Sequence, residues 1–471
     1  MSYKILGIRF SKPKIYLIRL LLLSVLVGIT AGLGALVFYL LLSAGKYLFL
    51  GLGMGYFPAG ANGEKDLFPL TLREFTPWLV LIIPFLGGLL SGLIIYKFAP
   101  ETEGHGTDSA IFNYHHRNGN IKVRTPLVKT IVSVLTIGSG GSGGQEGPIA
   151  QIGSGIGSNL AKILGLSNYE KRTLMSAGMA GGIGAIFGAP MAGALFAAEV
   201  LYQDLDFEYE ILIPASISSI IANGVFSFFL GNKNLFIVPE AIFGGYLELI
   251  PYSCLSIVIA IGAIFFTKIF YKTHGMFRKA KFSNFLKPAL GGFFVGIIAF
   301  LAFQIIPHTE ETDYGVLATG YGVVQKALFG ELPLMFLVFI VVGKIFTTSF
   351  SIASGGSGGV FGPSVVIGGS IGGAFGIISN YIFPYIQISP AAFVIIGIAG
   401  FFSAAANTPI STILMVSEIT GNFELLVPAM WVSFLAYLIA SKTHLYENQI
   451  KSRFYSPVHH KKVEERFFER T

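Results

Sequence analysis

The sequence is poor in charge and in cysteine. Only 12% of its 471 residues are charged and 53% are hydrophobic, whereas soluble domains carry about 25% charged residues. A single cysteine, Cys254, excludes an intrachain disulfide and any metal site built from several cysteines. The scarcity of charge excludes an ordinary soluble globular protein and indicates a membrane protein.

Long apolar stretches recur along the whole chain. They cover residues 15–51, 78–96, 130–161, 211–230, 249–267, 288–306 and 425–441. A helix needs about 20 apolar residues to cross the hydrocarbon core of a bilayer, and several of these stretches are long enough. The first is too long for a removable signal peptide. The chain is therefore predicted to be an all-α, polytopic membrane protein.

The distribution of charge predicts the orientation of this protein. Basic residues dominate the first 19 positions, residues 268–287 and the C-terminal tail, whereas the first acidic residue is Glu64. By the positive-inside rule, both termini are expected in the cytoplasm. The expected location of the protein is the plasma membrane. The acidic segment 308–313 is expected outside. Topology thus explains the net charge of +7, and no nucleic-acid partner is expected.

Two passages of the first half of the chain return in the second half. Residues 138–148, Gly-Ser-Gly-Gly-Ser-Gly-Gly-Gln-Glu-Gly-Pro, match residues 353–363, Ala-Ser-Gly-Gly-Ser-Gly-Gly-Val-Phe-Gly-Pro. Residues 178–199 match residues 397–418 at nearly the same separation. A duplicated unit is predicted, with an N-terminal segment (1–14), a first membrane repeat (15–235), a second membrane repeat (236–455) and a short tail (456–471).

The glycine runs at the start of these passages indicate broken helices inside the membrane. Non-helical backbone at membrane depth persists only inside protein or around a cavity, and transporters place their sites at such repeat interfaces. The Gly-Pro pair after each run favours a helix start. Its free amide groups and positive dipole end favour an anion. The alternative is that the glycines only permit close helix packing.

Glu146 is the only ionisable residue between positions 130 and 161. A carboxylate at membrane depth is costly and is by default a functional candidate. Because it directly precedes a Gly-Pro helix start, it competes with an anion for the same amide groups and can act as a gate that carries a proton. The alternative is a stabilising helix cap. Glu199 and Glu418 are duplicated, and are therefore expected to be structural residues hydrogen-bonded at helix ends.

The residues 144–148, Gly-Gln-Glu-Gly-Pro, resemble the GxEGP gating motif of the CLC chloride channels and chloride/proton antiporters. Residues 359–363, Gly-Val-Phe-Gly-Pro, resemble the GxFxP motif of that family, and Lys129, residues 397–400 and the segment Leu445-Tyr-Glu-Asn448 fit its pattern. The likeness covers roughly residues 15–455. It implies a homodimer with one pathway per subunit, about 18 tilted and re-entrant helices in inverted repeats, and no C-terminal CBS domains.

The resemblance also implies roles for individual residues. Glu146 is expected to be the gate and proton acceptor. The anion-binding residues are expected to be His105, Gly106, Gly147, Val360, Phe361 and Tyr446. Chloride is the expected ion, with fluoride, nitrate or another small anion open. Neither a cofactor nor a metal is expected.

The sequence departs from the family pattern at the GSGIP motif, which corresponds to Gly104-His-Gly-Thr-Asp108. His105 therefore replaces the serine that normally touches the anion. It either donates one neutral N–H or becomes charged near neutral pH, and both remain open. Asp108 replaces the proline, and is predicted to cap the short helix that follows.

A second departure concerns proton coupling. Many antiporters of the family carry a glutamate directly after the position of Glu199, whereas this chain has Val200. Val200 favours channel-like or weakly coupled transport, with a chloride/proton antiporter whose proton route bypasses Val200 as the alternative. His115 and His116 are predicted to be a solvated pair in a connector, and the alternative is a proton relay.

An enzyme is not expected. An intramembrane serine protease could use Ser139 or Ser142, but it explains neither the recurrence of these serines in the second repeat nor Glu146. A phosphate-binding loop would need a Gly-Lys-Ser/Thr sequence after the glycines, and none follows.

Overall fold

The structure, a computed structural model, describes residues 2–5, 8–65, 67–69, 73–305, 314–386 and 388–459. Apart from a short hairpin of β1 (Ser2–Ile5) and β2 (Ile8–Ser11), the regular structure of these residues is helical, with sixteen α-helices. The predicted all-α fold is confirmed. The acidic segment 308–313 and the tail beyond residue 459 lie outside the described residues.

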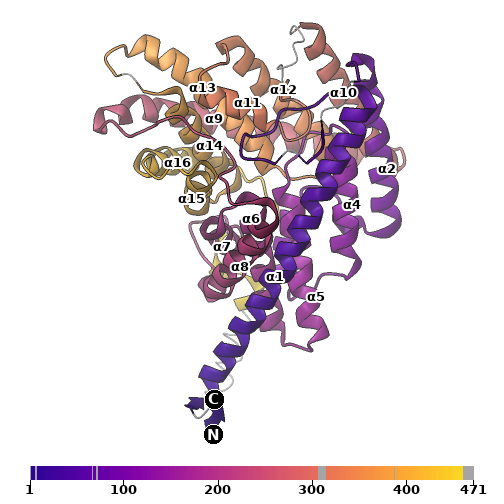
Figure 1. The fold of residues 1–471 in the computed structure, drawn as a ribbon, viewed down its shortest axis with the longest axis vertical. Coiled ribbons are helices and arrows are strands. Elements are labelled where there is room, and N and C mark those ends of the chain that lie inside the picture. Colours follow the sequence, from indigo (N-terminus) through magenta and orange to yellow (C-terminus); the bar gives the residue numbers. More distant parts are fainter. Residues whose placement is uncertain are drawn as a thin grey trace.

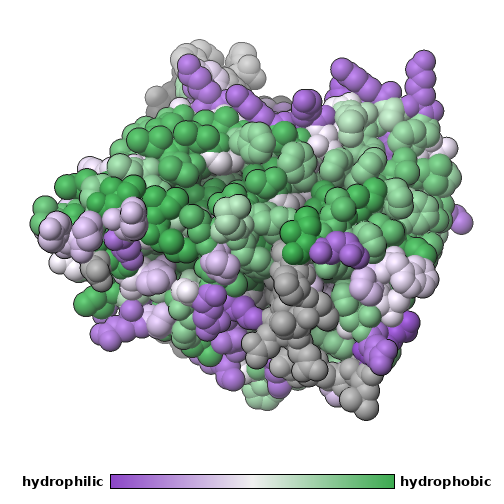
Figure 2. Space-filling view, turned by 90° about the horizontal axis from the view of Figure 1, so that it is seen from above, coloured by the Kyte–Doolittle hydropathy of each residue, from purple (hydrophilic) through white to green (hydrophobic). Residues whose placement is uncertain are grey.

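The helices are apolar enough for a membrane. Within the described ranges, seven helical segments have the length and hydropathy of a membrane span: Leu17–Leu52, Pro77–Phe98, Tyr209–Leu230, Tyr246–Lys279, Asn284–Ile305, Leu334–Ile352 and Phe361–Ile382. Figure 2 shows hydrophobic residues gathered in a belt across one face, with hydrophilic residues along its two margins. Such a belt suits contact with lipid tails.

The same series of helices occurs twice along the chain (Figure 1). The first series is α1 (Lys12–Lys46), α2 (Ile83–Phe98), α3 (Thr107–His116), α4 (Arg124–Gly138), α5 (Glu146–Ile163), α6 (Asn168–Phe187), α7 (Pro190–Glu199) and α8 (Leu212–Leu230). The second is α9 (Leu249–Lys279), α10 (Lys287–Ile305), α11 (Tyr321–Leu328), α12 (Leu334–Ile352), α13 (Phe361–Ile382), α14 (Pro390–Ala406), α15 (Pro409–Thr420) and α16 (Leu426–Ala440).

The apolar stretch 130–161 is not one helix. Helix α4 ends at Gly138 and α5 begins at Glu146, and in the second repeat α12 and α13 are separated in the same way. The backbone between them is buried. The predicted helix breaks inside the protein are therefore present in both halves.

Other glycines serve the close packing that was the alternative explanation. A Cβ atom on Gly153 of α5 would overlap the carbonyl of Gly178 on α6, and a Cβ atom on Gly178 would overlap that of Gly153. In the second repeat, a Cβ atom on Gly397 would lie 2.5 Å from the carbonyl oxygen of Gly368. Small residues thus let these helix backbones approach each other.

The buried Glu199 at the end of α7 and the half-buried Glu418 near the end of α15 tie the repeats together. The Glu199 carboxylate accepts hydrogen bonds from the backbone N–H groups of Ile410 (3.0 Å) and Ser411 (2.7 Å) at the start of α15. The Glu418 carboxylate accepts bonds from Met191 (3.1 Å) and Ala192 (2.8 Å) at the start of α7. Each acid therefore caps the other repeat's helix, and the expected structural role at helix ends is confirmed.

Helix α1 defines two sides of the molecule. It begins beside α6, where Arg19 pairs with Glu170, and its 35 residues run about 50 Å to Lys46. The C-terminal segment lies near its beginning, because His459 and Arg172 of α6 line one small cavity. We call this the terminal side, and the side on which α1 ends the distal side. In Figure 1, α1 begins at the bottom of the molecule and runs upward.

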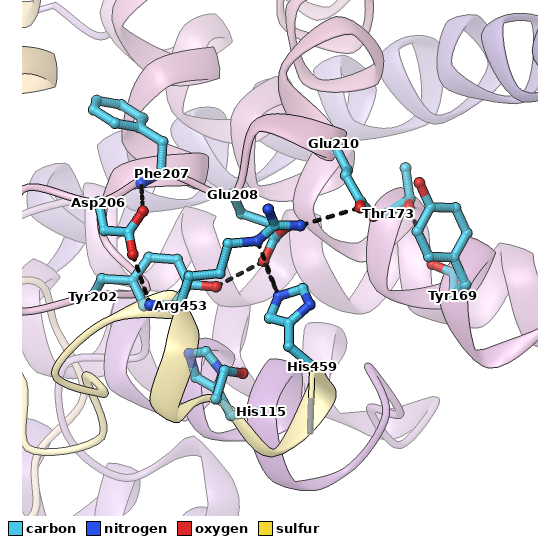
Figure 3. Close-up of polar contacts among 11 residues, drawn as sticks. His115, Tyr169, Thr173, Tyr202, Asp206, Phe207, Glu208, Glu210, Arg453 and His459 are labelled. Atoms are coloured by element: carbon cyan, nitrogen blue, oxygen red, sulfur yellow. Dashed lines mark hydrogen bonds and ion pairs between the residues drawn. The ribbon is translucent and has the colours of Figure 1, made fainter. Parts of the chain in front are cut away.

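A cluster of charged residues holds the C-terminal segment on the terminal side (Figure 3). Arg453 contacts Glu208 (3.0 Å) and Glu210 (3.1 Å), and His459 contacts the other oxygen of Glu208 at 2.8 Å. The Tyr202 hydroxyl also donates to Glu208 (2.7 Å). Glu208 is buried, so its partners supply the compensation that a buried carboxylate requires.

His115 belongs to the same region. Its two ring nitrogens lie 2.9 Å from the Ser456 hydroxyl and 3.1 Å from the Leu201 carbonyl oxygen. The prediction of a solvated pair in a connector is wrong, because both residues lie in α3 and His115 is buried; only the His116 side chain is exposed, as predicted. The sequence interpretation did not recognise that these histidines are the last two residues of a helix, α3.

Candidate functional site

The two glycine runs meet at the interface of the repeats. The Gly144 N–H donates to the Gly359 carbonyl at 2.8 Å, and the Gly359 N–H donates to the Gly144 carbonyl at 2.7 Å. Hydroxyl pairs repeat this exchange, since Ser142 lies 2.8 Å from Thr348 and Ser133 lies 2.9 Å from Ser357. The first turns of α5 and α13 are therefore held side by side.

Ser139 and Ser142, the serines of the protease alternative, are used in this framework. The Ser139 hydroxyl donates to the Thr136 carbonyl at 3.2 Å, and Ser142 pairs with Thr348. Their contacts explain why the serines recur in both repeats, and they assign these hydroxyls to the scaffold.

Glu146 lies across the starts of both helices. Its side chain is buried and one carboxylate oxygen accepts a hydrogen bond from the Gly362 N–H, in the first turn of α13, at 3.0 Å. The other oxygen is also buried and has no hydrogen-bond partner among the described residues. A Cβ atom on Gly144 or Gly359 would overlap this carboxylate, and one on Gly359 would also lie 2.7 Å from the backbone nitrogen of Gly147, so the lack of a side chain at these positions makes room for the carboxylate. The carboxylate thus accepts a hydrogen bond from a helix-start N–H group that could otherwise bind an anion.

The loop with His105 packs against the start of α5. A Cβ atom on Gly147 would overlap the His105 carbonyl oxygen, so the two backbones touch. Gly106 has a φ of +82°, which favours glycine. The Lys129 ammonium of α4 fixes the loop by donating to the carbonyls of Thr102 (3.0 Å) and Gly104 (2.8 Å).

Aromatic rings surround the same point. The His105 ring lies 5.3 Å from the Tyr446 ring, and the Nδ1 atom of His105 is buried with no partner in the described part of the chain. Phe361, the first residue of α13 and next to Val360, packs its ring edge-to-face against Phe402 at 4.6 Å.

Asp108 does not cap α3, contrary to the prediction. Gly106 is the N-cap residue, and the Asp108 carboxylate instead accepts bonds from the Asn448 side chain and, at 2.8 Å, from the Asn448 backbone N–H. The Asp108 carboxylate therefore links the start of α3 to the C-terminal segment that carries Tyr446. Sequence alone could not show this contact, because it joins residues 340 positions apart.

Two cavities approach these residues. A cavity of about 360 Å³ is lined by Gly104, His105 and Gly106 together with Asp108 and Asn448, next to the C-terminal segment on the terminal side. A smaller cavity of about 60 Å³ lies on the distal side. It is lined by Gln145, which precedes α5, and by Glu64 and Lys65, which come after α1 in the chain. The site therefore lies between two hollows on opposite sides of the protein.

The structure thus brings together the residues named from the sequence. Glu146 and Gly147 begin α5, Val360 and Phe361 begin α13, and His105 and Gly106 come from the loop before α3. Tyr446 closes the group from the C-terminal segment. The sequence did not predict a place for Tyr321 in this group. Its buried hydroxyl has no partner among the residues described and lies beside Gly362.

Val200 lies away from this group, at the end of α7. Its side chain is buried and its carbonyl accepts a bond from the Gln449 side chain at 3.1 Å. The adjacent Glu199 is held by α15. The position that carries a proton-transferring acid in many antiporters therefore offers no ionisable side chain here.

Comparison with known proteins identifies the class. The family described as "Voltage gated chloride channel" matches residues 87–441, which is more than half of the chain. The chain therefore belongs to the CLC family of anion-transport proteins, as its motifs predicted.

Individual relatives support the same family assignment. The H(+)/Cl(-) exchange transporter ClcA of Vibrio cholerae is 30% identical over 434 residues, which are 89% of this chain and 86% of the relative. A putative chloride channel protein, ClcB-like, of Ralstonia nicotianae is 26% identical over 79% of this chain and 85% of the relative.

The fold is also that of solved structures. A slow cyanobacterial Cl⁻/H⁺ antiporter aligns with a TM-score of 0.75 and 21% identity over 90% of this chain and 94% of its own. A CLC-type fluoride/proton antiporter aligns with a TM-score of 0.76 and 19% identity over 93% and 98%. These likenesses confirm the predicted CLC-type fold.

Proposed function

We propose that this protein exchanges chloride for protons across the membrane, and that Glu146 is both the gate of the anion pathway and the proton acceptor. The observation that carries the proposal is the place of the Glu146 carboxylate, which accepts the Gly362 N–H of α13 while its second oxygen has no hydrogen-bond partner in the described part of the chain. A carboxylate in this place excludes an anion. Protonation removes its charge, weakens its hold on the amide, and lets an anion enter.

The central anion site is proposed on the terminal side of Glu146. The backbone of Gly106, Gly147, Val360 and Phe361 and the side chains of His105 and Tyr446 form its walls. The starts of two long helices favour negative charge without a full cation, so an anion binds weakly enough to leave. The Nδ1 atom of His105, which has no hydrogen-bond partner within the described ranges, supports a role for this ring as an anion ligand in place of a hydroxyl.

Exchange rather than an uncoupled pathway is proposed because relatives that match most of the chain are named as exchange transporters. Since Val200 cannot carry a proton, the proton route bypasses it. The cavity beside His105 on the terminal side supplies a way for protons to approach. Val200 favours the second candidate, a channel-like or weakly coupled chloride pathway.

The test is a simultaneous flux measurement in chloride-loaded liposomes. Chloride efflux accompanied by proton uptake at a fixed ratio, with the proton movement absent in Glu146→Gln, supports exchange. Chloride efflux without proton movement supports the channel-like candidate. Absence of anion flux, with fluoride and nitrate also tried, contradicts the proposal.

The assembly and orientation are part of this proposal. A homodimer with one pathway in each subunit, a plasma-membrane location and cytoplasmic termini fit the family resemblance and the basic residues around the first helix. The protein is proposed to be a transporter without enzymatic activity. Cross-linking through the exposed Cys254 and protease access to the tail in intact cells test the assembly and the orientation.

A further inference from the structure

The loop that carries His105 has a counterpart in the second repeat. Helix α3 is preceded by Gly104-His105-Gly106 and helix α11 by Ala318-Thr319-Gly320. Both helices begin after a glycine with positive φ, +82° at Gly106 and +77° at Gly320. The two loops are therefore equivalent turns of the duplicated unit.

Buried lysines hold both loops in the same way. As Lys129 of α4 donates to the Gly104 carbonyl at 2.8 Å, Lys344 of α12 donates to the Ala318 carbonyl at 2.9 Å. Each loop also bonds to the glycine run of the other repeat: the Gly104 N–H donates to Gly356 (3.0 Å) and the Ala318 N–H donates to Gly140 (3.2 Å). The second loop therefore approaches the helix starts from the opposite side.

Tyr321, the first residue of α11, extends from this second loop toward the gate. Its side chain is 1% exposed, and its hydroxyl is buried without a partner in the described ranges. A Cβ atom on Gly362 would lie 3.1 Å from that hydroxyl oxygen. Gly362 is the residue whose N–H binds Glu146, and Tyr321 shares the distal cavity with Gln145.

A buried hydroxyl without a partner costs free energy and is rare in native proteins. Packing does not require it, because the ring rests edge-to-face on Phe236 at 5.6 Å, and phenylalanine would fill the same space. The hydroxyl is therefore available to donate to a ligand at the start of α13. The second oxygen of Glu146, which is buried and has no hydrogen-bond partner among the described residues, lies beside Gly144, and Gly144 in turn lies beside Gly362.

We propose that the Tyr321 hydroxyl is the anion ligand on the distal side of the gate, donating a hydrogen bond to the anion that replaces the Glu146 carboxylate at the start of α13. Tyr446 and Tyr321 then supply one phenol on each side of Glu146. This inference rests on the proposed anion pathway and adds a residue that sets how tightly the distal end of that pathway holds chloride.

The experiment compares Tyr321→Phe with the parent in the Glu146→Ala background, where the anion has no carboxylate competitor. Chloride affinity is measured by titration calorimetry and the unfolding temperature is measured alongside. The control is Tyr252→Phe, which removes a buried hydroxyl bonded to Glu248 away from the gate. We expect Tyr321→Phe to weaken chloride binding about tenfold at an unchanged unfolding temperature, and Tyr252→Phe to leave the affinity unchanged.

Unchanged chloride affinity in Tyr321→Phe, with clear binding by the parent, would overturn this inference and leave the proposed function standing. Equal weakening by Tyr252→Phe would overturn it as well, since the effect would then come from general packing. Absence of chloride binding in both the parent and the wild-type protein would overturn the proposed function and this inference together.

Discussion

Removing the Glu146 carboxylate should tighten chloride binding. In the structure this group holds the Gly362 N–H at 3.0 Å, a donor that an anion needs. Chloride must therefore displace the carboxylate before it can bind at the start of α13. In Glu146→Ala the competitor is gone, and the amide is free for the ion.

The magnitude follows from the single hydrogen bond that the structure shows. A hydrogen bond to a charged group contributes about 1.5–3 kcal/mol, and each 1.4 kcal/mol changes a dissociation constant about tenfold. The alanine variant should thus bind chloride about 10- to 150-fold more tightly than the wild type at neutral pH. The gain should diminish on acidification, because protonation of Glu146 removes the competing charge from the wild type.

Titration calorimetry of purified protein with chloride, in a buffer of a non-binding anion, measures this change. The control is Glu424→Ala, which removes an exposed carboxylate far along the chain between α15 and α16. We expect its affinity to equal that of the wild type. If Glu146→Ala bound chloride no more tightly than Glu424→Ala, the carboxylate would not compete with the anion, and the reasoning would be refuted.

Three further predictions concern the framework. Glu199→Ala should lower the free energy of unfolding by about 3 kcal/mol or more, because three donors at the start of α15 lose a charged acceptor. Glu418→Ala removes an acceptor from two donors and should cost less; equal unfolding temperatures of the two variants would contradict this. Asp108→Ala and Asn448→Ala, which break the contact between these two residues, should each weaken chloride binding several-fold without unfolding the protein. Calorimetry measures both affinities, and an unchanged affinity would contradict this prediction. Acidification should destabilise the wild type more than Glu208→Gln, measured as unfolding temperature against pH; parallel curves would contradict it.

The sign of the acid effect comes from Glu208. Burial raises the pKa of its carboxyl, but hydrogen bonds from His459 and Tyr202 and the charges of His459 and Arg453 outweigh burial and leave the pKa below its ordinary value. A carboxyl with a depressed folded-state pKa stabilises the fold above its unfolded pKa of about 4.3. That contribution is lost as the pH falls from there through the folded-state value. Glu208→Gln cannot lose it, so its curve should be flatter.

The helix breaks and the place of Glu146 at the start of α5 could be predicted from the sequence because they rest on local rules. A glycine run before Gly-Pro inside an apolar stretch determines a broken helix wherever it lies, and a lone acid there stands out against its neighbours. The duplication then placed the two helix starts together. The expected roles of Glu199 and Glu418 followed from their equivalence, although their partners did not.

The missed features depend on contacts between distant parts of the chain. Asp108 has the composition of a helix cap, but Asn448 competes successfully for its carboxylate. His115 appeared to lie in a polar connector, yet Ser456 and Leu201 bury it. Tyr321 carried no signal of its own, because one tyrosine in an apolar sequence is indistinguishable from a core residue. The structure makes it a candidate anion ligand because its hydroxyl lies beside Gly362.

The most direct test of the account is a recording of chloride efflux and external pH together, from liposomes that contain the purified wild-type protein or Glu146→Gln. The account predicts chloride efflux coupled to proton uptake in the wild type, and chloride movement without proton uptake in the variant. Proton uptake that persists in Glu146→Gln at the wild-type ratio would contradict it, because the proton would then cross without the residue that is proposed to carry it.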